Sequence, residues 1–305
     1  MENTTIISTY GLIVPPQVSV IIPVYNGERT IKRALDSIFA QTFPSLEVIV
    51  VDDASIDGTV SVVAQYNDDR LTIIRPPENQ GAGAARNKGI AQARGRWVAF
   101  LDADDAWKPE KLARQVELLQ RSSKPIGACA TGYDIEKNGR RFSIALNLMP
   151  HRFRYDILFG CTISPGSTLM VERSVFDRVG YFDEKFRRLE DWDWLLRFSE
   201  HYDMEFVPTP LADIYTWESP NSSKSTDLVI DGIRHMKKKH ASRLGLWRGL
   251  QFRSSLLVEH AAVLHRAGRP LDAIFYVGLA LAIYPVRNMG FFRTMWRATL
   301  DRLRR

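Results

Sequence analysis

The chain has 305 residues, of which 45% are hydrophobic and 25% are charged, so its composition is that of a globular protein and excludes a fibrous or wholly disordered one. Its two cysteines, Cys129 and Cys161, are too few for a disulfide framework, and neither has a close Cys or His partner at metal-site spacing. The net charge of +6 is unevenly distributed, because residues 231–305 hold 15 of the 41 lysines and arginines but 4 of the 35 acidic residues. This region carries +11 and the remainder −5, which predicts an acidic body with a basic tail that faces an anionic surface, either membrane or nucleic acid.

The first 135 residues alternate between strand and helix patterns. Short apolar runs predict strands at residues 18–24, 46–51, 71–74 and 96–101. Helical spacing of apolar residues predicts helices at residues 28–41, 59–66 and 82–94, and Pro109 suits the first position of a fourth. Repeated units of this length imply an α/β protein with a mostly parallel sheet and right-handed crossovers.

The rest of the chain is less regular. We expect a fifth strand at residues 126–134, loops over 138–168 and a tryptophan-rich helix at 187–202. Two prolines and a polar run predict an extended segment near residue 210 and then a flexible connection over 218–226. The chain after about residue 228 is predicted to be helical, and the helices are expected to end at Gly268–Pro270 and at Pro285.

The sequence shows no membrane-spanning or secretory segment. The N-terminal 17 residues lack a basic region followed by a long apolar run. The most apolar stretch, residues 274–286, has 13 residues and is too short to span a bilayer. We therefore expect a cytoplasmic protein without a transmembrane anchor.

Acidic residues follow two of the predicted parallel strands. Asp52 and Asp53 end the second strand, and Asp102, Asp104 and Asp105 follow the fourth. Ligands of such sheets bind beyond the carboxyl ends of the strands, and clustered carboxylates repel one another unless a cation lies among them. Oxygen ligands suit Mg²⁺ or Mn²⁺ bound to substrate phosphates. The alternative is that these residues are turn formers and helix N-caps.

A glycine-rich segment, residues 81–89, fails as a dinucleotide-binding fingerprint, because Arg86 stands at the sixth position and the segment does not follow the first strand. It could present helix N-terminal amides to an anion, with Arg86 and Lys88 adding positive charge, and we expect Arg86 to take part in donor binding. The alternative is a helix of small residues packed closely on the sheet.

Five segments in fixed order resemble the family 2 glycosyltransferases, which have the GT-A fold: residues 18–27, 50–59, 79–87, 100–105 and 190–193. The resemblance implies an α/β GT-A nucleotide-binding fold with a C-terminal helical extension. It implies a catalytic domain over residues 1–228, with a nucleotide half at about 17–135 and an acceptor half at about 136–228. Residues 229–305 would form the basic helical region.

The resemblance also implies roles on the donor side. Pro23, Val24 and Tyr25 would line the nucleotide pocket, and Asp53 would accept a hydrogen bond from the base. The donor would be a nucleotide-diphosphate sugar linked to UDP, GDP or dTDP.

Asp102-Ala-Asp104 matches the Asp-X-Asp motif of the family. Asp104 would hold Mn²⁺ or Mg²⁺, and Asp102 would bind the ribose or a metal-bound water. Asp105 is an alternative metal ligand, since a run of acids leaves the register open. The metal would neutralise the departing diphosphate.

On the acceptor side, Glu190-Asp191 matches the Glu-Asp pair of the family, and Asp191 would be the general base of an inverting transfer. Glu190 and Trp192 would lie beside the acceptor, although core packing is the favoured reading of Trp192. The alternative for Glu190, Asp191 and Asp193 is that they only complement the helix dipole.

The resulting prediction is a metal-dependent glycosyltransferase whose acceptor is a hydroxyl of a glycan or a lipid-linked glycan.

Aromatic and basic residues alternate over 286–305, which suits peripheral attachment to the inner face of an anionic membrane, although a solvated helix is the alternative. Nucleic acid is disfavoured, because no recognition module accompanies the charge. Rival predictions are a sugar-phosphate nucleotidyltransferase, whose phosphate loop is absent after the first strand, and an inactive scaffold, against which the complete set of acids argues.

Overall fold

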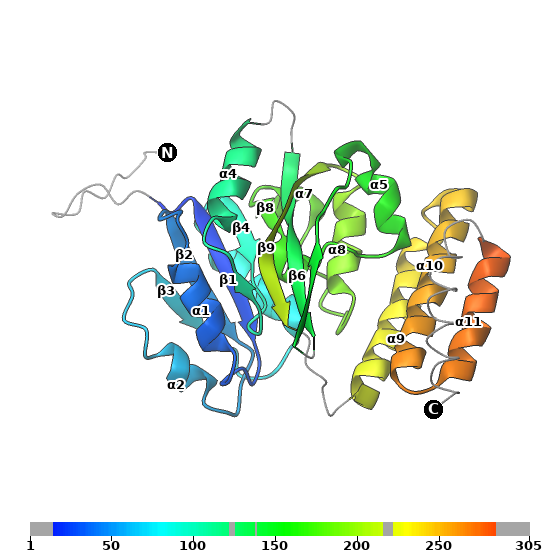
Figure 1. Ribbon diagram of the computed structural model, residues 1–305, viewed down its shortest axis with the longest axis horizontal. Coiled ribbons are helices and arrows are strands. Elements are labelled where there is room, and N and C mark those ends of the chain that lie inside the picture. Colours follow the sequence, from blue (N-terminus) through cyan, green and yellow to red (C-terminus); the bar gives the residue numbers. More distant parts are fainter. Residues whose placement is uncertain (1–14, 122–125, 138, 216–221, 285–305) are drawn as a thin grey trace.

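The computed structural model describes residues 15–121, 126–137, 139–215 and 222–284. A twisted central sheet with helices on its faces forms the body, and three long helices pack together at one end (Figure 1). The alternation of strands and helices confirms the predicted α/β class.

The strands of the sheet lie in the order β3-β2-β1-β4-β8-β6-β9-β5, and β7 pairs with β6. Their bounds are β1 Val18–Val24, β2 Leu46–Asp52, β3 Leu71–Ile74, β4 Trp97–Phe100, β5 Ala106–Trp107, β6 Ile126–Lys137, β7 Arg140–Ile144, β8 Met170–Glu172 and β9 Asp203–Tyr215. The four strands from β3 to β4 are parallel, as is the β6/β9 pair, whereas β8 joins its neighbours antiparallel.

The parallel half of the sheet sets the position of the functional edge. Every residue of β1, β2 and β4 is buried, as expected for strands covered on both faces. Val24 pairs with Asp52, and Ile21 pairs with Phe100, so these strands end near one another. The residues that follow, including Tyr25, Asp53 and Asp102, therefore emerge at the same edge of the sheet.

Helices cover the sheet and build the C-terminal end. Their bounds are α1 Ile31–Phe39, α2 Thr59–Val63, α3 Ala82–Gln92, α4 Lys111–Arg121, α5 Phe153–Asp156, α6 Pro165–Thr168, α7 Val175–Val179, α8 Glu190–Phe198, α9 Ser222–His240, α10 Gly245–Arg266 and α11 Pro270–Ile283, with 3₁₀ turns η1 Pro150–Arg152 and η2 Ile157–Phe159. In α1 the buried residues are Ile31, Ala34, Leu35 and Ile38, which is the spacing of a single helix face.

The expectation of loops over residues 138–168 is wrong in part. This stretch contains β7 and the short helices from η1 to the start of α6. In β7, four of the five residues are exposed and the fifth is partly buried, so its sequence lacks the alternation that marks a half-buried strand. The helices are three or four residues long, too short to show a helical period.

The C-terminal helices are joined to the α/β body by a shared core. Ile233 and Met236 of α9 and Phe252 of α10 belong to the same buried cluster as the sheet. A smaller cluster, formed by Ala261, Leu264, Ala273 and Val277, holds α10 against α11. The predicted boundary at residue 228 stays a prediction, and the buried core crosses it.

None of the helices in the described part of the chain combines the length and the apolar character that crossing a membrane requires. The basic segment at residues 286–305, for which a membrane-facing helix is predicted, lies outside the described residues.

The helix of small residues, α3, packs directly on β1. A Cβ added at Gly89 would lie 2.5 Å from Cγ2 of Ile21, which is fully buried and cannot move aside. Gly278 in α11 is exposed and has no neighbouring atom within 4 Å of an added Cβ. Alanine substitutions at these two glycines are therefore expected to change the stability of the protein in opposite directions.

Gly89→Ala is expected to lower the free energy of unfolding by about 1–3 kcal/mol, because the added methyl overpacks the α3–β1 contact. The matched variant Gly278→Ala is expected to raise it by about 0.5–1 kcal/mol, because alanine is the better helix former. Urea unfolding followed by circular dichroism measures both. Equal effects of the two substitutions would contradict the close packing of α3.

Candidate active site

A cleft of about 1100 Å³ opens at the carboxyl edge of the parallel strands. It is lined by the segments after β1 and β4, the start of α3, the turn at α6 and the residues around the start of α8. The facing sides of α9 and α10 close its other end. The cleft therefore collects residues from both halves of the predicted catalytic domain and from the C-terminal helices.

Arg86 joins the two acidic motifs of the cleft. Its guanidinium, on a side chain only 6% exposed, bonds Oδ1 of Asp102 at 2.7 Å and Oε1 of Glu190 at 2.8 Å. Burial by itself lowers the pKa of Arg86, but the charges of Asp102, Glu190 and Asp191 more than offset this and raise the pKa. Arg86 thus stays a cation and holds α3, the end of β4 and the start of α8 together.

The three acids after β4 face different surroundings. Asp102 lies in the cleft beneath the backbone of Gly166, where an added Cβ would lie 2.2 Å from its Oδ2. Asp104 also lines the cleft, and burial, together with the charge of Asp102, raises the pKa of its carboxyl group. Only a glycine at position 166 leaves room for Asp102 in this position.

Asp105 points away from the cleft. Its two oxygens accept hydrogen bonds from the Ser167 hydroxyl at 2.5 Å and from the Tyr215 amide at 3.0 Å. Burial and the charge of Asp102 raise the pKa of Asp105 to about 8. Its contacts are those of a residue that ties the β4–β5 segment to α6 and β9.

Asp53 is buried behind the cleft. Its carboxylate accepts the backbone amides of Gln80 at 2.9 Å and Gly81 at 2.7 Å, and so fixes the loop that begins α3. Pro23, Val24 and Tyr25 line the cleft, and the Tyr25 side chain is 50% exposed. The predicted contact of Asp53 with a nucleotide base stays a prediction.

Glu190 and Asp191 begin α8 at the centre of the cleft. Leu189 directly before them has φ of +68°, a left-handed conformation that leucine rarely adopts and that turns the chain into the helix. Glu190 is paired with Arg86, whereas Asp191 accepts a hydrogen bond from the backbone amide of Trp192 at 2.7 Å. Burial and the neighbouring Glu190 raise the pKa of Asp191 to about 7.

Trp192 is part of the core. It is 2% exposed, its indole nitrogen donates to the carbonyl oxygen of Ile157 at 2.7 Å, and its ring packs edge-on against Phe252 of α10 with centroids 5.7 Å apart. These contacts favour packing, and the predicted acceptor-side role of Trp192 stays a prediction.

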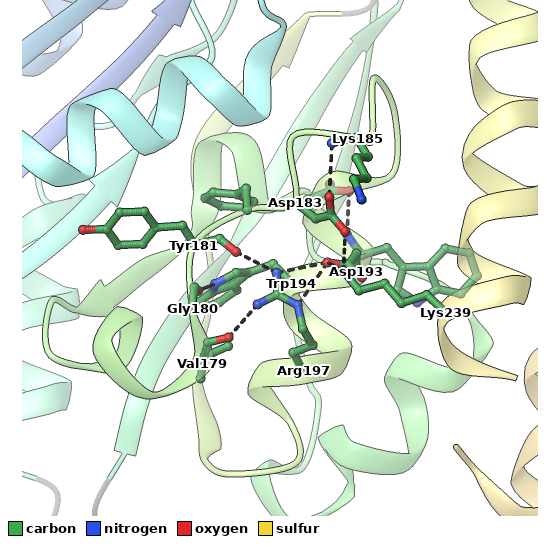
Figure 2. Close-up of polar contacts among 12 residues, drawn as sticks. Val179, Gly180, Tyr181, Asp183, Lys185, Asp193, Trp194, Arg197 and Lys239 are labelled. Carbon is green, nitrogen blue, oxygen red and sulfur yellow. Dashed lines mark hydrogen bonds and ion pairs between the residues drawn. The ribbon is translucent and has the colours of Figure 1, made fainter. Parts of the chain in front are cut away.

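A buried ionic network anchors the other face of α8 (Figure 2). Asp193 is fully buried and accepts bonds from Arg197 at 3.0 Å, from Lys239 at 2.9 Å and from His240 at 2.7 Å. Burial alone would raise its pKa, but the hydrogen bond from His240 and the charges of Arg197 and Lys239 lower it to about 2. Lys239 also pairs with Asp183 at 2.6 Å.

Only part of this network could be predicted from the sequence. The i, i+4 spacing of Asp193 and Arg197 was visible, but Lys239 and His240 are 46 and 47 residues away along the chain. His240 is 3% exposed and bonded to Asp193.

The fold of the described residues is the GT-A fold, which two solved structures share. Residues 19–180 match the glycosyl transferase family 2. The chain belongs to the glycosyl transferase family 2, and the predicted family resemblance and GT-A fold with a C-terminal helical extension are confirmed. The predicted enzyme class, a glycosyltransferase, is the class of this family.

Two relatives from Bacillus subtilis illustrate the similarity. TuaG, a glycosyltransferase provisionally assigned to teichuronic acid biosynthesis, is 39% identical over 164 residues, which are 52% of this chain and 63% of TuaG. The uncharacterised glycosyltransferase YwdF is 31% identical over 241 residues, 77% of this chain and 85% of YwdF. The chain thus spans under two thirds of the first relative and most of the second.

Two solved structures share the fold. That of S. aureus TarS residues 1–349 with UDP-GlcNAc superposes with a TM-score of 0.63 and 23% identity, covering 89% of this chain and 82% of TarS 1–349. The mannosyltransferase PcManGT from Pyrobaculum calidifontis, with GDP-Man and Mn²⁺, superposes with a TM-score of 0.61 and 24% identity, covering 94% of this chain and 81% of PcManGT.

Asp193→Asn is expected to lower the free energy of unfolding by about 3 kcal/mol at pH 7, because it removes the buried carboxylate that Arg197, Lys239 and His240 bond. The folded pKa of about 2 lies below the ordinary value, so this stabilisation is present above about pH 4 and is lost as the pH falls through 2. Urea unfolding at several pH values measures it.

The matched control is Asp231→Asn, which removes an exposed pair with Arg234 on α9 and is expected to change stability by less than about 0.5 kcal/mol. If Asp193→Asn and the wild type lost stability equally between pH 4 and 2, the assignment of the low pKa to Asp193 would be wrong.

Proposed function

We propose that this chain transfers a sugar, with inversion, from a nucleotide-diphosphate donor to a hydroxyl of a glycan or a lipid-linked glycan. The observation that carries the proposal is the position of Arg86, which brings the Asp102 segment and the Glu190–Asp191 pair to one cleft. The first would serve the donor and the second the acceptor.

Asp191 has the properties of a general base. A base works best when its pKa is near the working pH, and burial with the neighbouring Glu190 raises the pKa of Asp191 to about 7. Arg86 is bonded to Glu190 and Asp102, which leaves Asp191 without an ion pair among the described residues. In the proposed reaction Asp191 accepts the proton of the acceptor hydroxyl as it attacks the sugar on the face opposite the leaving diphosphate.

The donor would bind across the edge of the parallel strands. Pro23, Val24 and the half-exposed Tyr25 line that end of the cleft and offer a ring on which a base can stack. The structural neighbours were solved with UDP-GlcNAc and with GDP-Man, which supports a nucleotide-sugar donor of the UDP, GDP or dTDP type. Arg86 would act there through the position it gives Asp102.

The residues present fit a divalent metal. Three acidic, histidine or cysteine side chains do not converge on one point in the described ranges, but Mg²⁺ and Mn²⁺ bound to a nucleotide need only one or two carboxylates. Asp102 and Asp104 both line the cleft, where burial and the charge of Asp102 raise the pKa of Asp104. A bound cation would offset the repulsion between the two carboxylates. PcManGT was solved with Mn²⁺.

We assign Asp104 as the direct ligand and Asp102 as its neighbour toward the ribose. The oxygens of Asp105 are engaged by Ser167 and Tyr215, which makes Asp105 the weaker candidate. When bound, the metal supplies Lewis-acid stabilisation of the departing diphosphate.

Peripheral attachment to the inner face of an anionic membrane through residues 286–305 remains part of the proposal.

Asp191→Asn is expected to lower kcat by about 10²- to 10⁴-fold, because the amide cannot take the proton. The affinity for UDP should stay within about twofold, since Asp191 faces the acceptor. Turnover is measured with a panel of nucleotide sugars and acceptors, and UDP binding by calorimetry. The control Asp177→Asn changes an exposed residue of α7 and should alter neither quantity. Equal loss of binding and turnover in Asp191→Asn would mean that the residue is misassigned.

The pH dependence of the proposed transfer follows from the carboxyl group of Asp191. Because the base must be deprotonated, kcat/KM should rise with pH and level off above about pH 7, where Asp191 titrates. The charged and titratable groups that act on or respond to it are Glu190, Arg86, Asp102 and Cys161. A rate that is flat between pH 5 and 8 would argue against Asp191 as the base.

Asp104→Asn is expected to abolish the gain in UDP affinity that Mn²⁺ provides over EDTA, because it removes the direct ligand. Asp105→Asn is expected to keep that gain, since its side chain faces Ser167 and Tyr215. Calorimetric titration of UDP with and without Mn²⁺ measures both. The reverse result would reassign the ligand to Asp105.

A further inference from the structure

One residue of helix α1 reaches the backbone of the expected metal ligand. Arg33 donates a hydrogen bond from Nη2 to the carbonyl oxygen of Asp104, although the two residues are 71 positions apart along the chain. Arg33 lines the cleft, but nothing in the helical pattern around it predicts a site residue. The contact ties α1, which follows the nucleotide end of the cleft, to the acidic segment after β4.

The side chain of Arg33 is oriented by an aromatic ring. The central carbon of its guanidinium lies 3.6 Å from the centroid of the Tyr215 ring. A flat guanidinium that stacks on a ring keeps its N–H donors available at its edges. Tyr215 is the last residue of β9, and its backbone amide bonds Asp105 at 3.0 Å. One tyrosine therefore acts on the acidic segment twice, directly through its amide and indirectly through Arg33.

Arg33 borders open space on two sides. Besides the cleft, it lines a second hollow of about 520 Å³ between α1 and the end of β9. Its Nε atom is buried and has no hydrogen-bond partner among the described residues. The Asp104 carbonyl and the Tyr215 ring are therefore the contacts that direct the guanidinium.

The acidic segment is also anchored on either side of Asp104. The Ser167 hydroxyl accepts a hydrogen bond from the amide of Asp102 at 3.1 Å and donates one to the carboxylate of Asp105 at 2.5 Å. Arg33 supplies the contact at Asp104 itself. Because the rotamers open to a side chain depend on the backbone that carries it, this contact restricts where the Asp104 carboxylate can point.

We propose that Arg33, oriented by Tyr215, is a positioning residue for the metal ligand Asp104. Arg33 holds the backbone of Asp104 and so sets how tightly the cleft binds a divalent cation together with the donor diphosphate. Groups that orient a ligand contribute to metal affinity, because a carboxylate that is free to rotate must be ordered when the metal binds. The proposal deepens the proposed function and rests on it, since it takes Asp104 as the direct ligand.

The test measures, by calorimetry on the full-length protein, the gain in UDP affinity that Mn²⁺ provides over EDTA. Arg33→Gln is expected to reduce this gain about tenfold and to leave the UDP affinity in EDTA within about twofold. Arg33→Lys should restore little of the gain, because an ammonium keeps the charge but not the flat donor edge. The matched control Lys32→Gln removes the neighbouring charge on α1, which pairs with Asp36, and should keep the full gain.

Substitutions of Tyr215 test how the guanidinium is oriented. Tyr215→Phe keeps the ring and should match the wild type, whereas Tyr215→Leu should lose the Mn²⁺ gain as Arg33→Gln does. The double variant Arg33→Gln/Tyr215→Leu should lose no more than either single variant, since both substitutions remove the same contact.

A full Mn²⁺ gain in Arg33→Gln would overturn the proposal. So would a full gain in Arg33→Lys, which would make Arg33 only a charge near the diphosphate, or equal losses in Tyr215→Phe and Tyr215→Leu. The absence of any Mn²⁺ gain in the wild type would instead refute the metal assistance of the proposed function. Urea unfolding without metal would then still test the contact, and additive losses of stability in the double variant would overturn the orientation of Arg33 by Tyr215.

Discussion

The arrangement of the cleft depends on one buried cation, Arg86. The carboxylates of Asp102, Glu190 and Asp191 would repel one another, and the guanidinium offsets that repulsion while bonding the first two. Arg86 and Glu190 are 104 residues apart, so a single side chain of α3 links distant segments of the chain at the start of α8. The asymmetry between Glu190, which is paired, and Asp191, which is left with a raised pKa, follows from the same contact.

The fold was predictable where burial leaves a mark on the sequence. Strands β1, β2 and β4 are buried on both faces, so each is a continuous apolar run, and the acids that follow them were expected at one edge. Strand β7 is mostly exposed and joins the sheet only through β6, so its residues carry no such pattern. The start of α9 at Ser222 was placed about six residues late, because the polar run before residue 228 resembles a flexible connection.

Which residues belong to the site could be predicted from the sequence better than where their side chains point. The acids at 102, 104 and 105 could be listed from the sequence, but their orientation is set by Gly166, Ser167 and Tyr215, which lie on distant segments. The same holds for Asp193, whose partners Lys239 and His240 come from another helix. Local spacing contains no information on contacts of this kind, since they arise only when the sheet and the C-terminal helices close on one another.

The short helix α8 has different neighbours on two sides: Asp191 faces the cleft, and Asp193 faces α9. Through Gly232, which approaches the turn before Glu190, and through the Asp193 network, the C-terminal helices support the start of α8 and with it Asp191. They cannot therefore be exchanged as an independent module. A recombinant protein that takes its C-terminal helices from a relative must also keep the matching cations and the glycine, or Asp191 will be displaced from its position in the cleft.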